Sequence, residues 1–291
     1  MSTSDSTIKP GGPLLNQARA RRGPRLSFIE RVLIGVVVLY AAVLLLGPLA
    51  ALAWSSLVDG AGEFVRQVTS PDALSSLKLT LMLAAGATII NTVFGLCVAW
   101  ILVRDGFAGQ KIINGLVDLP FAVSPVIAGF MLILLFGRGG WLTPIIDWLG
   151  IKVVFAVPGM LIATTFISLP FVIREVMPVL SQLGLEQENA AYTMGAGKLQ
   201  TFWRVTLPAV RWGLLYGVSL TFARAVGEIG AVLVVSGGVS HLTETSTLFI
   251  FRSLDDRNYV GAYAMAVVLA AITFVILMLM ESLKKRSEAV D

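Results

Sequence analysis

The sequence predicts an all-α, polytopic membrane protein with six transmembrane helices and both termini in the cytoplasm. The chain of 291 residues is 56% hydrophobic and only 14% charged, a balance that is not typical of soluble domains. Its apolar residues gather in six runs, each close to the roughly 20 residues that a helix needs to cross a bilayer. Its basic residues lie mostly in alternate connecting segments, which indicates the orientation.

The predicted transmembrane helices cover 32–54, 79–103, 112–136, 153–173, 212–235 and 260–280. The fifth is the least apolar, because Arg224 and Glu228 interrupt it. Residues 1–31 are rich in Gly, Pro, Ser and Arg, which predicts a disordered basic tail near anionic head groups. Residues 281–291 form a second predicted cytoplasmic tail.

The distribution of Lys and Arg predicts the side on which each segment lies. Fifteen of these residues fall in the two tails, in the turn after the second helix and in the 174–211 segment, whereas six fall in the other three loops. The positive-inside rule therefore places both termini and the 174–211 segment in the cytoplasm.

Composition excludes several other functions. The net charge of +4 is modest and dispersed, so no nucleic acid is expected as a partner. Cys97 is the only cysteine, which excludes an intramolecular disulfide and a thiolate metal site; its apolar context predicts a buried side chain. The only histidine, His241, lies in the 239–259 loop with scattered carboxylates, which predicts a solvated loop facing a partner rather than a metal site.

The stretch from Gly195 to Lys198 reads Gly-Ala-Gly-Lys and resembles part of an ATP-binding loop. Such a loop needs a glycine where this chain has Tyr192, and a hydroxyl residue where it has Leu199. No strand pattern precedes it either. The chain is therefore expected to bind no ATP, metal or other cofactor and to have no catalytic residue.

The same segment, residues 182–208, is predicted to form two short helices on the cytoplasmic surface. Acidic residues open the first helix, and Gly195 and Gly197 end it. The second has an apolar face that includes Trp203 and is expected to end at Pro208. Such a surface suits docking in a partner's groove, although a helix lying on the lipid head groups remains an alternative.

The residues of this segment carry a resemblance to a known family. Permeases of the binding-protein-dependent ABC importers have Glu-Ala-Ala, three residues, Gly, nine residues and then Ile-x-Leu-Pro. This chain keeps both spacings with Asn189-Ala190-Ala191, Gly195 and Val205-Thr206-Leu207-Pro208. Asn189 replaces the family glutamate, and Glu188 stands one residue earlier. The resemblance implies that the residues that couple to the ATPase are Glu188, Asn189, Ala190, Ala191, Gly195, Leu207 and Pro208.

Longer stretches, among them "DLPFAVSPVIAG" and "RVTLPAVRWGLLYGVSLTFARAVGEIGA", are similar to sulfate/thiosulfate permeases of the CysW type. The resemblance implies a type I ABC importer permease fold over residues 77–280 and inward transport of sulfate or thiosulfate across the bacterial inner membrane. It also implies four kinds of contact: a second permease of the CysT type, an ATPase dimer that uses ATP and magnesium, a periplasmic or lipid-anchored sulfate-binding protein, and membrane lipids. Molybdate permeases share part of the pattern, so molybdate or tungstate stays an alternative substrate.

A pair of charges inside the fifth helix has two interpretations. Arg224 lies about 20 Å beyond Arg211 along a helix, and Glu228 follows at the i+4 position on the same face. The pair either lends positive potential to an anion pathway or locks the helix to its neighbours; Asp118 is a second candidate partner for Arg224. A secondary transporter that uses these three residues as a relay remains a rival function, although the inverted repeats expected of one are not seen.

Overall fold

The computed structural model describes residues 27–288, with side chains described as far as Ser282, and no strand occurs in this range. The helices are α1 (Phe28–Ser56), α2 (Ala61–Val68), α3 (Pro71–Arg104), α4 (Gln110–Val117), α5 (Leu119–Ala122), α6 (Pro125–Phe136), α7 (Thr143–Leu149), α8 (Val157–Leu183), α9 (Glu186–Thr193), α10 (Lys198–Thr201), the π-helical turn η1 (Phe202–Thr206), α11 (Leu207–Val226), α12 (Gly230–Val235), α13 (Ser246–Asp255) and α14 (Tyr259–Glu288). The chain divides into two compact units, one up to Ala50 and the other from Ala51 onward. The predicted 1–31 tail falls mostly outside the described residues.

Four of the described helices are long and apolar enough to cross a membrane: α1, α3, α8 and α14. α1, α3 and α14 each cover one of the predicted spans and extend beyond it, whereas α8 starts four residues later than the predicted 153–173 span and extends ten residues further. In the first unit, nearly all of the described residues belong to α1, which starts where Glu30 accepts a hydrogen bond from the backbone N–H of Ser27 at 2.7 Å. The coarse prediction of an all-helical protein with several membrane-length helices is therefore confirmed.

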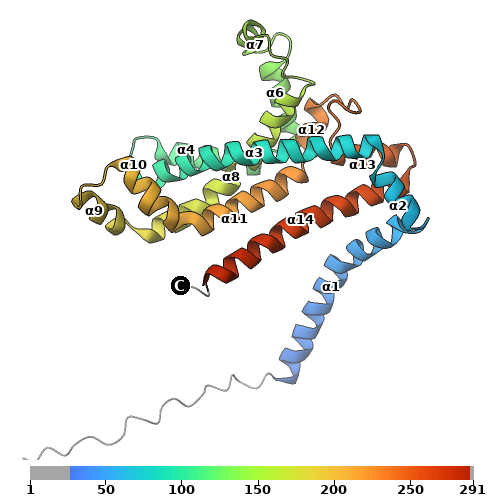
Figure 1. Cartoon of the computed structure of the whole chain (residues 1–291), viewed down its shortest axis with the longest axis horizontal. Helices are drawn as coiled ribbons and strands as arrows, with labels where there is room; N and C mark the ends of the chain where they lie inside the picture. Colours follow the sequence, from blue (N-terminus) through green and yellow to red (C-terminus); the bar gives the residue numbers. More distant parts are fainter. Residues whose placement is uncertain (1–26, 289–291) are drawn as a thin grey trace, which may run out of the picture. The chain divides into compact units, whose positions relative to one another are not determined.

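The core of the second unit is the packing of α3, α8 and α11 along one another (Figure 1). Small residues allow the close approach: a Cβ added at Gly95 of α3 would lie 2.9 Å from the Cβ of Val172 in α8. One added at Gly217 of α11 would lie 3.0 Å from the Cα of the same valine. Val172 is thus enclosed between two glycines, the small-residue packing that membrane helices use.

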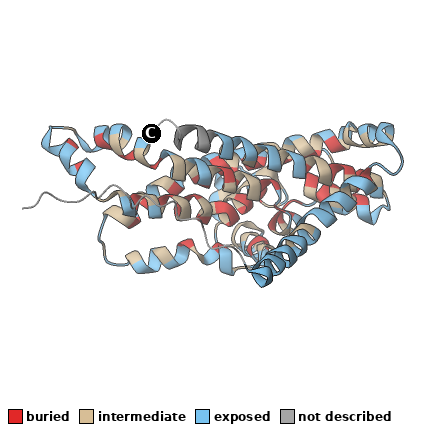
Figure 2. Ribbon diagram, turned by 90° about the horizontal axis from the view of Figure 1, so that it is seen from below, coloured by how far each residue is buried: buried red, intermediate tan, exposed pale blue. Residues whose placement is uncertain are grey.

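A buried amide also joins two of these helices. Asn91 of α3 donates from Nδ2 to the backbone oxygen of Thr165 at 3.0 Å and to Oγ of Ser168 at 2.9 Å. Figure 2 shows that buried residues gather in the middle of the bundle, where such polar groups need partners inside the protein.

Cys97 is exposed, which contradicts the expected burial. It lies near Val93 and Phe94 on the outward face of α3, and the outward face of a membrane helix is apolar because it meets lipid.

Two predicted spans are broken in the structure. The 112–136 span consists of α4, α5 and α6, and the chain is extended at Val123 and Ser124 because Pro125 disfavours helical geometry in the preceding residue. The 212–235 span stops at Val226 and resumes at Gly230 as α12. The α12 segment packs against α6. Non-helical backbone at membrane depth is tolerated only inside protein or beside water.

The predicted end of a helix at Pro208 is wrong. The π-helical turn η1 leads directly into α11, and Pro208 lies in the first turn of α11. Proline is acceptable there because its missing N–H and its ring affect only the preceding turn, which here has the wider π geometry. The second short helix of the 182–208 segment is therefore continuous, through η1, with the 20-residue α11.

Candidate functional site

The first candidate site is the segment formed by α9, the turn 194–197, α10 and η1, here called the knob. It lies at one end of the α3–α8–α11 bundle, and α2 and α13 lie at the other end (Figure 1). The expected arrangement of helix, glycine turn and helix is present. Its second half is short, because α10 has four residues before η1 begins.

The turn depends on Gly195, which has a φ of +86°. Its N–H donates to the backbone oxygen of Tyr192 at 2.9 Å, and the N–H of Ala196 donates to the oxygen of Ala191 at 3.0 Å. These two bonds complete the Schellman pattern that closes a helix with a left-handed residue. Gly195 therefore ends α9 and reverses the chain toward α10, and no phosphate cradle is involved.

Glu188 is the buried anchor of the knob. Its Oε1 accepts from Arg104 Nε at 3.2 Å, from Arg104 Nη2 at 3.0 Å and from Thr206 Oγ1 at 2.9 Å. The side chains of Arg104 and Glu188 are 8% and 5% exposed. One carboxylate thus ties α9 to the end of α3 and to η1, a role that the sequence did not reveal because nothing marks Arg104 as its partner.

The other residues expected to couple differ in exposure. Asn189 and Ala190 face outward, whereas Ala191 is buried against the bundle. Gly195 and Pro208 are exposed and Leu207 is half-buried. Glu188 forms an ion pair with Arg104, whereas the neighbouring Asn189 belongs to the surface.

The outer surface of the knob carries several large apolar side chains. Large side chains stand free at Tyr192, Met194, Leu199 and Trp203, with Met194 85% and Leu199 73% exposed. Phe202 turns inward and packs on Trp100 of α3, with ring centroids 5.5 Å apart. Exposed apolar side chains gathered on a small rigid element are typical of a docking surface.

The second candidate site is the pair of charges at the break between α11 and α12. Nη1 of Arg224 lies 2.7 Å from Oε2 of Glu228, so the expected pairing is present. Glu228 also accepts a hydrogen bond at Oε1 from the backbone N–H of Ala231 at 2.9 Å, which caps the start of α12. Its own backbone oxygen accepts from Thr247 Oγ1 of α13 at 2.8 Å. Glu228 thus stabilises the interrupted geometry.

Asp118 is not part of this pair, which corrects the alternative expectation. It lies between α4 and α5, where it accepts from Arg174 of α8: Nε lies 2.7 Å from Oδ1, and Nη2 lies 2.5 Å from Oδ2. Arg174 also donates to the backbone oxygen of Asn114 at 3.0 Å. The sequence missed this partner because Asp118 and Arg174 are 56 positions apart.

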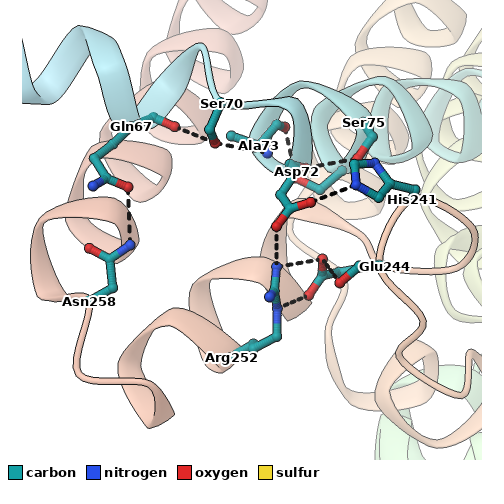
Figure 3. Close-up of polar contacts among 11 residues, drawn as sticks. Gln67, Ser70, Asp72, Ala73, Ser75, His241, Glu244, Arg252 and Asn258 are labelled. Atoms are coloured by element: carbon teal, nitrogen blue, oxygen red, sulfur yellow. Dashed lines mark hydrogen bonds and ion pairs between the residues drawn. The ribbon is translucent and has the colours of Figure 1, made fainter.

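A third polar cluster was not expected at all. The 239–259 loop contains α13 and folds against the start of α3, so it is not the solvated loop that the sequence predicted (Figure 3). Arg252 lies between two carboxylates: Nε is 2.6 Å from Glu244 Oε1, and Nη2 is 3.3 Å from Asp72 Oδ2. Nε2 of His241 lies 2.7 Å from Asp72 Oδ1. The hydrogen bond to Glu244 raises the pKa of Arg252, which keeps it charged.

Comparison with known proteins identifies a matching family and similar relatives. The family described as "Binding-protein-dependent transport system inner membrane component" matches residues 91–288. The chain is 47% identical over 266 residues to the sulfate transport system permease protein CysW of Synechocystis sp., covering 91% of this chain and 96% of the relative. It is 39% identical over 253 residues to the corresponding protein CysT of Salmonella typhimurium, covering 87% and 91%.

A solved structure has the same fold. It is a bacterial alginate ABC transporter in complex with an alginate pentasaccharide-bound periplasmic protein, with a TM-score of 0.74 at 17% identity. The match covers 89% of this chain and 94% of the solved chain. Together with the membrane-length helices, these findings make the chain a multi-pass membrane protein. It belongs to the family of binding-protein-dependent transport system inner-membrane components, within which it is a permease of the CysW type.

Proposed function

We propose that this chain is the membrane-spanning permease subunit of an ATP-driven importer that carries sulfate or thiosulfate into the cell. The observation that carries the proposal is the 47% identity to a sulfate permease over nearly the whole of both chains. The knob adds a physical reason, because it offers an apolar docking surface held rigidly to α3 and α11.

The proposed topology has six membrane crossings with both termini in the cytoplasm. The crossings are α1, α3, the broken α4–α6, α8, the broken α11–α12, and α14. The knob then lies in the cytoplasm and α13 outside. The excess of Lys and Arg in the tails and around the knob supports this orientation.

Energy comes from a separate ATPase subunit, which holds ATP and magnesium. The knob sits in a cleft of that subunit, with Tyr192, Met194, Leu199 and Trp203 as its contact residues. When two ATPase copies close on ATP, they push the knob. Because Glu188 ties α9 to the ends of α3 and η1, the displacement passes to the α3–α8–α11 bundle, which opens outward; hydrolysis resets it.

The chain works beside a second permease of the CysT type and receives its anion from a periplasmic or lipid-anchored binding protein. Its similarity to both CysW and CysT proteins supports a heterodimer of related subunits. The solved relative with a loaded periplasmic protein supports delivery from outside.

Uptake of labelled sulfate tests the proposal. Cells that lack this chain and any redundant importer are expected to lose uptake and to regain it when the chain is restored. Competition with thiosulfate, molybdate and tungstate ranks the substrates. Uptake that is unimpaired without the chain, or that persists after ATP depletion but collapses with the proton gradient, contradicts an ATP-driven sulfate importer.

A further inference from the structure

The charges at the break between α11 and α12 differ in access. The side chain of Glu228 is only 2% exposed, whereas that of Arg224 is 32% exposed. The carboxylate therefore lies behind the guanidinium, and a solute that approaches this point from the open side meets positive charge.

The hydrogen-bond donors of Arg224 are also uncommitted. Nη1 lies 2.7 Å from Glu228 Oε2, but this oxygen accepts no hydrogen bond, so the contact is an ion pair without hydrogen-bond geometry. Within the part of the chain that the structure describes, Arg224 donates no hydrogen bond to any residue. A guanidinium has five N–H groups in a planar fork that matches tetrahedral oxyanions.

The exposed part of the Arg224 side chain is charged, so contact with lipid would be unfavourable. Arg224 is 13 residues beyond Arg211, the last basic residue before it, or about 20 Å along the helix axis. This depth lies within the roughly 30 Å of a bilayer's hydrocarbon core. Charged side chains at such depth face a bundle interior or a water-filled cavity, and backbone breaks are tolerated in the same places.

We propose that Arg224 lines the translocation pathway and that its open guanidinium face binds the transported oxyanion at the α11–α12 break. This inference rests on the proposed function for the identity of the anion, and on the proposed crossing of α11–α12 for the location. The ion pair with Glu228 lowers the net positive charge of the site, so the anion is attracted there and still released.

The test uses the assembled transporter with Cys97→Ala, which leaves no native cysteine in this chain. Arg224→Cys is introduced and treated with two thiol reagents of similar size and opposite charge, aminoethyl and sulfonatoethyl methanethiosulfonate. Val93→Cys is the matched control, because Val93 is 59% exposed but lies on the apolar outward face of α3. Labelling rates are measured with and without sulfate, molybdate and chloride.

We expect Arg224→Cys to react at least about tenfold faster than Val93→Cys, and divalent oxyanions but not chloride to slow the reaction. Before labelling, transport by the cysteine variant is expected to fall at least about tenfold, because a charged hydrogen-bond donor is lost. The ammonium-bearing reagent should restore part of it, and the sulfonate-bearing reagent none.

Two results would overturn the proposal. A cysteine at 224 as unreactive as the one at 93 shows that Arg224 faces lipid or the second permease. A reactive cysteine that no oxyanion protects shows a wet position outside the pathway. Protection by molybdate but not by sulfate instead leaves Arg224 in the pathway and contradicts only the proposed substrate.

Discussion

Among single residues, Glu188 has the clearest role, because one buried oxygen accepts three hydrogen bonds from two other elements. Removing one member of a buried ion pair leaves the other charged and unpaired, which costs about 3–5 kcal/mol. We therefore expect Glu188→Ala to lower the free energy of unfolding by about that amount and to detach the ATPase, as measured by thermal unfolding and co-purification of the complex.

Asn189→Ala is the neighbouring control for Glu188→Ala. Its side chain is exposed, so we expect a change within about 0.5 kcal/mol. Replacing both partners, Arg104→Met with Glu188→Leu, should recover part of the stability because no buried charge is left alone. Equal losses for Glu188→Ala and Asn189→Ala would mean that the buried pair does not anchor the knob.

Gly195 supports a second prediction, which concerns the backbone alone. A Cβ added there meets nothing within 4 Å, but the φ of +86° disfavours any residue with a side chain. Gly195→Ala should therefore cost about 1–2 kcal/mol and reduce transport while the protein still inserts in the membrane.

Gly197→Ala is the matched control, because Gly197 has equal free space and an ordinary φ of −76°. It should leave transport close to that of the parent protein in the same uptake assay. If both substitutions reduce transport alike, the cause is loss of surface contact and not the left-handed turn.

Among elements, the contact of α3 and α11 with α8 depends on the two glycines that enclose Val172. A methyl group on either glycine would lie 2.9 to 3.0 Å from the Cβ or the Cα of this valine, so the helices must separate. We expect Gly95→Ala and Gly217→Ala each to cost about 1–3 kcal/mol, measured as lower thermal stability of the purified complex.

Gly86→Ala tests the same helix without the same constraint. Its added Cβ would lie 3.0 Å from Cδ1 of Leu161, the flexible end of a side chain that can turn away. This variant should be less destabilised than Gly95→Ala. The reverse order would show that α3 and α8 are not held at the distance that Val172 sets.

The elements that could be predicted from the sequence are those with long uninterrupted apolar runs: α1, α3, α8 and α14 follow from length and composition alone. The break before Pro125 lies inside an apolar run, where hydropathy stays high across a change of direction. The break at Gly227 lies between Arg224 and Glu228, whose charges lower the hydropathy of the predicted span without marking where its helix ends. The α13 helix was missed because its ten residues end in charges that suggested a solvated loop. Its Arg252 is neutralised by Glu244 and Asp72, and a single sequence does not reveal that contact.

Some contacts of the candidate sites could be predicted and others could not, because a single sequence does not reveal contacts between distant residues. Spacing in the sequence was enough to pair Arg224 with Glu228, since four residues on one helix place two side chains together. It was not enough to pair Glu188 with Arg104 or Asp118 with Arg174, whose members are 84 and 56 residues apart. Local contacts follow from helix geometry, whereas long-range ones depend on how the helices pack.

At the scale of the whole molecule, the proposed mechanism requires the knob and α13 to lie on opposite sides of the membrane. Single cysteines in the Cys97→Ala background report this directly. Lys198→Cys in the knob and Arg257→Cys after α13 both replace exposed, charged residues, so neither should disturb the fold. In right-side-out vesicles, an impermeant maleimide is expected to label Arg257→Cys at once and Lys198→Cys only after permeabilisation.

The two broken spans make this experiment decisive for the count of crossings. If α11–α12 did not cross, Lys198→Cys and Arg257→Cys would be labelled from the same side. If α4–α6 did not cross, both cysteines would exchange compartments, because both follow it in the chain. Labelling of both cysteines from the same side would mean that α11–α12 does not cross the membrane. The proposed mechanism, in which closure of the ATPase at the knob opens the opposite end of the bundle, would then be contradicted. Labelling from opposite sides, together with a cytoplasmic C-terminus shown by the same reagent on Asp291→Cys, requires each broken span to pass through the membrane despite its interruption.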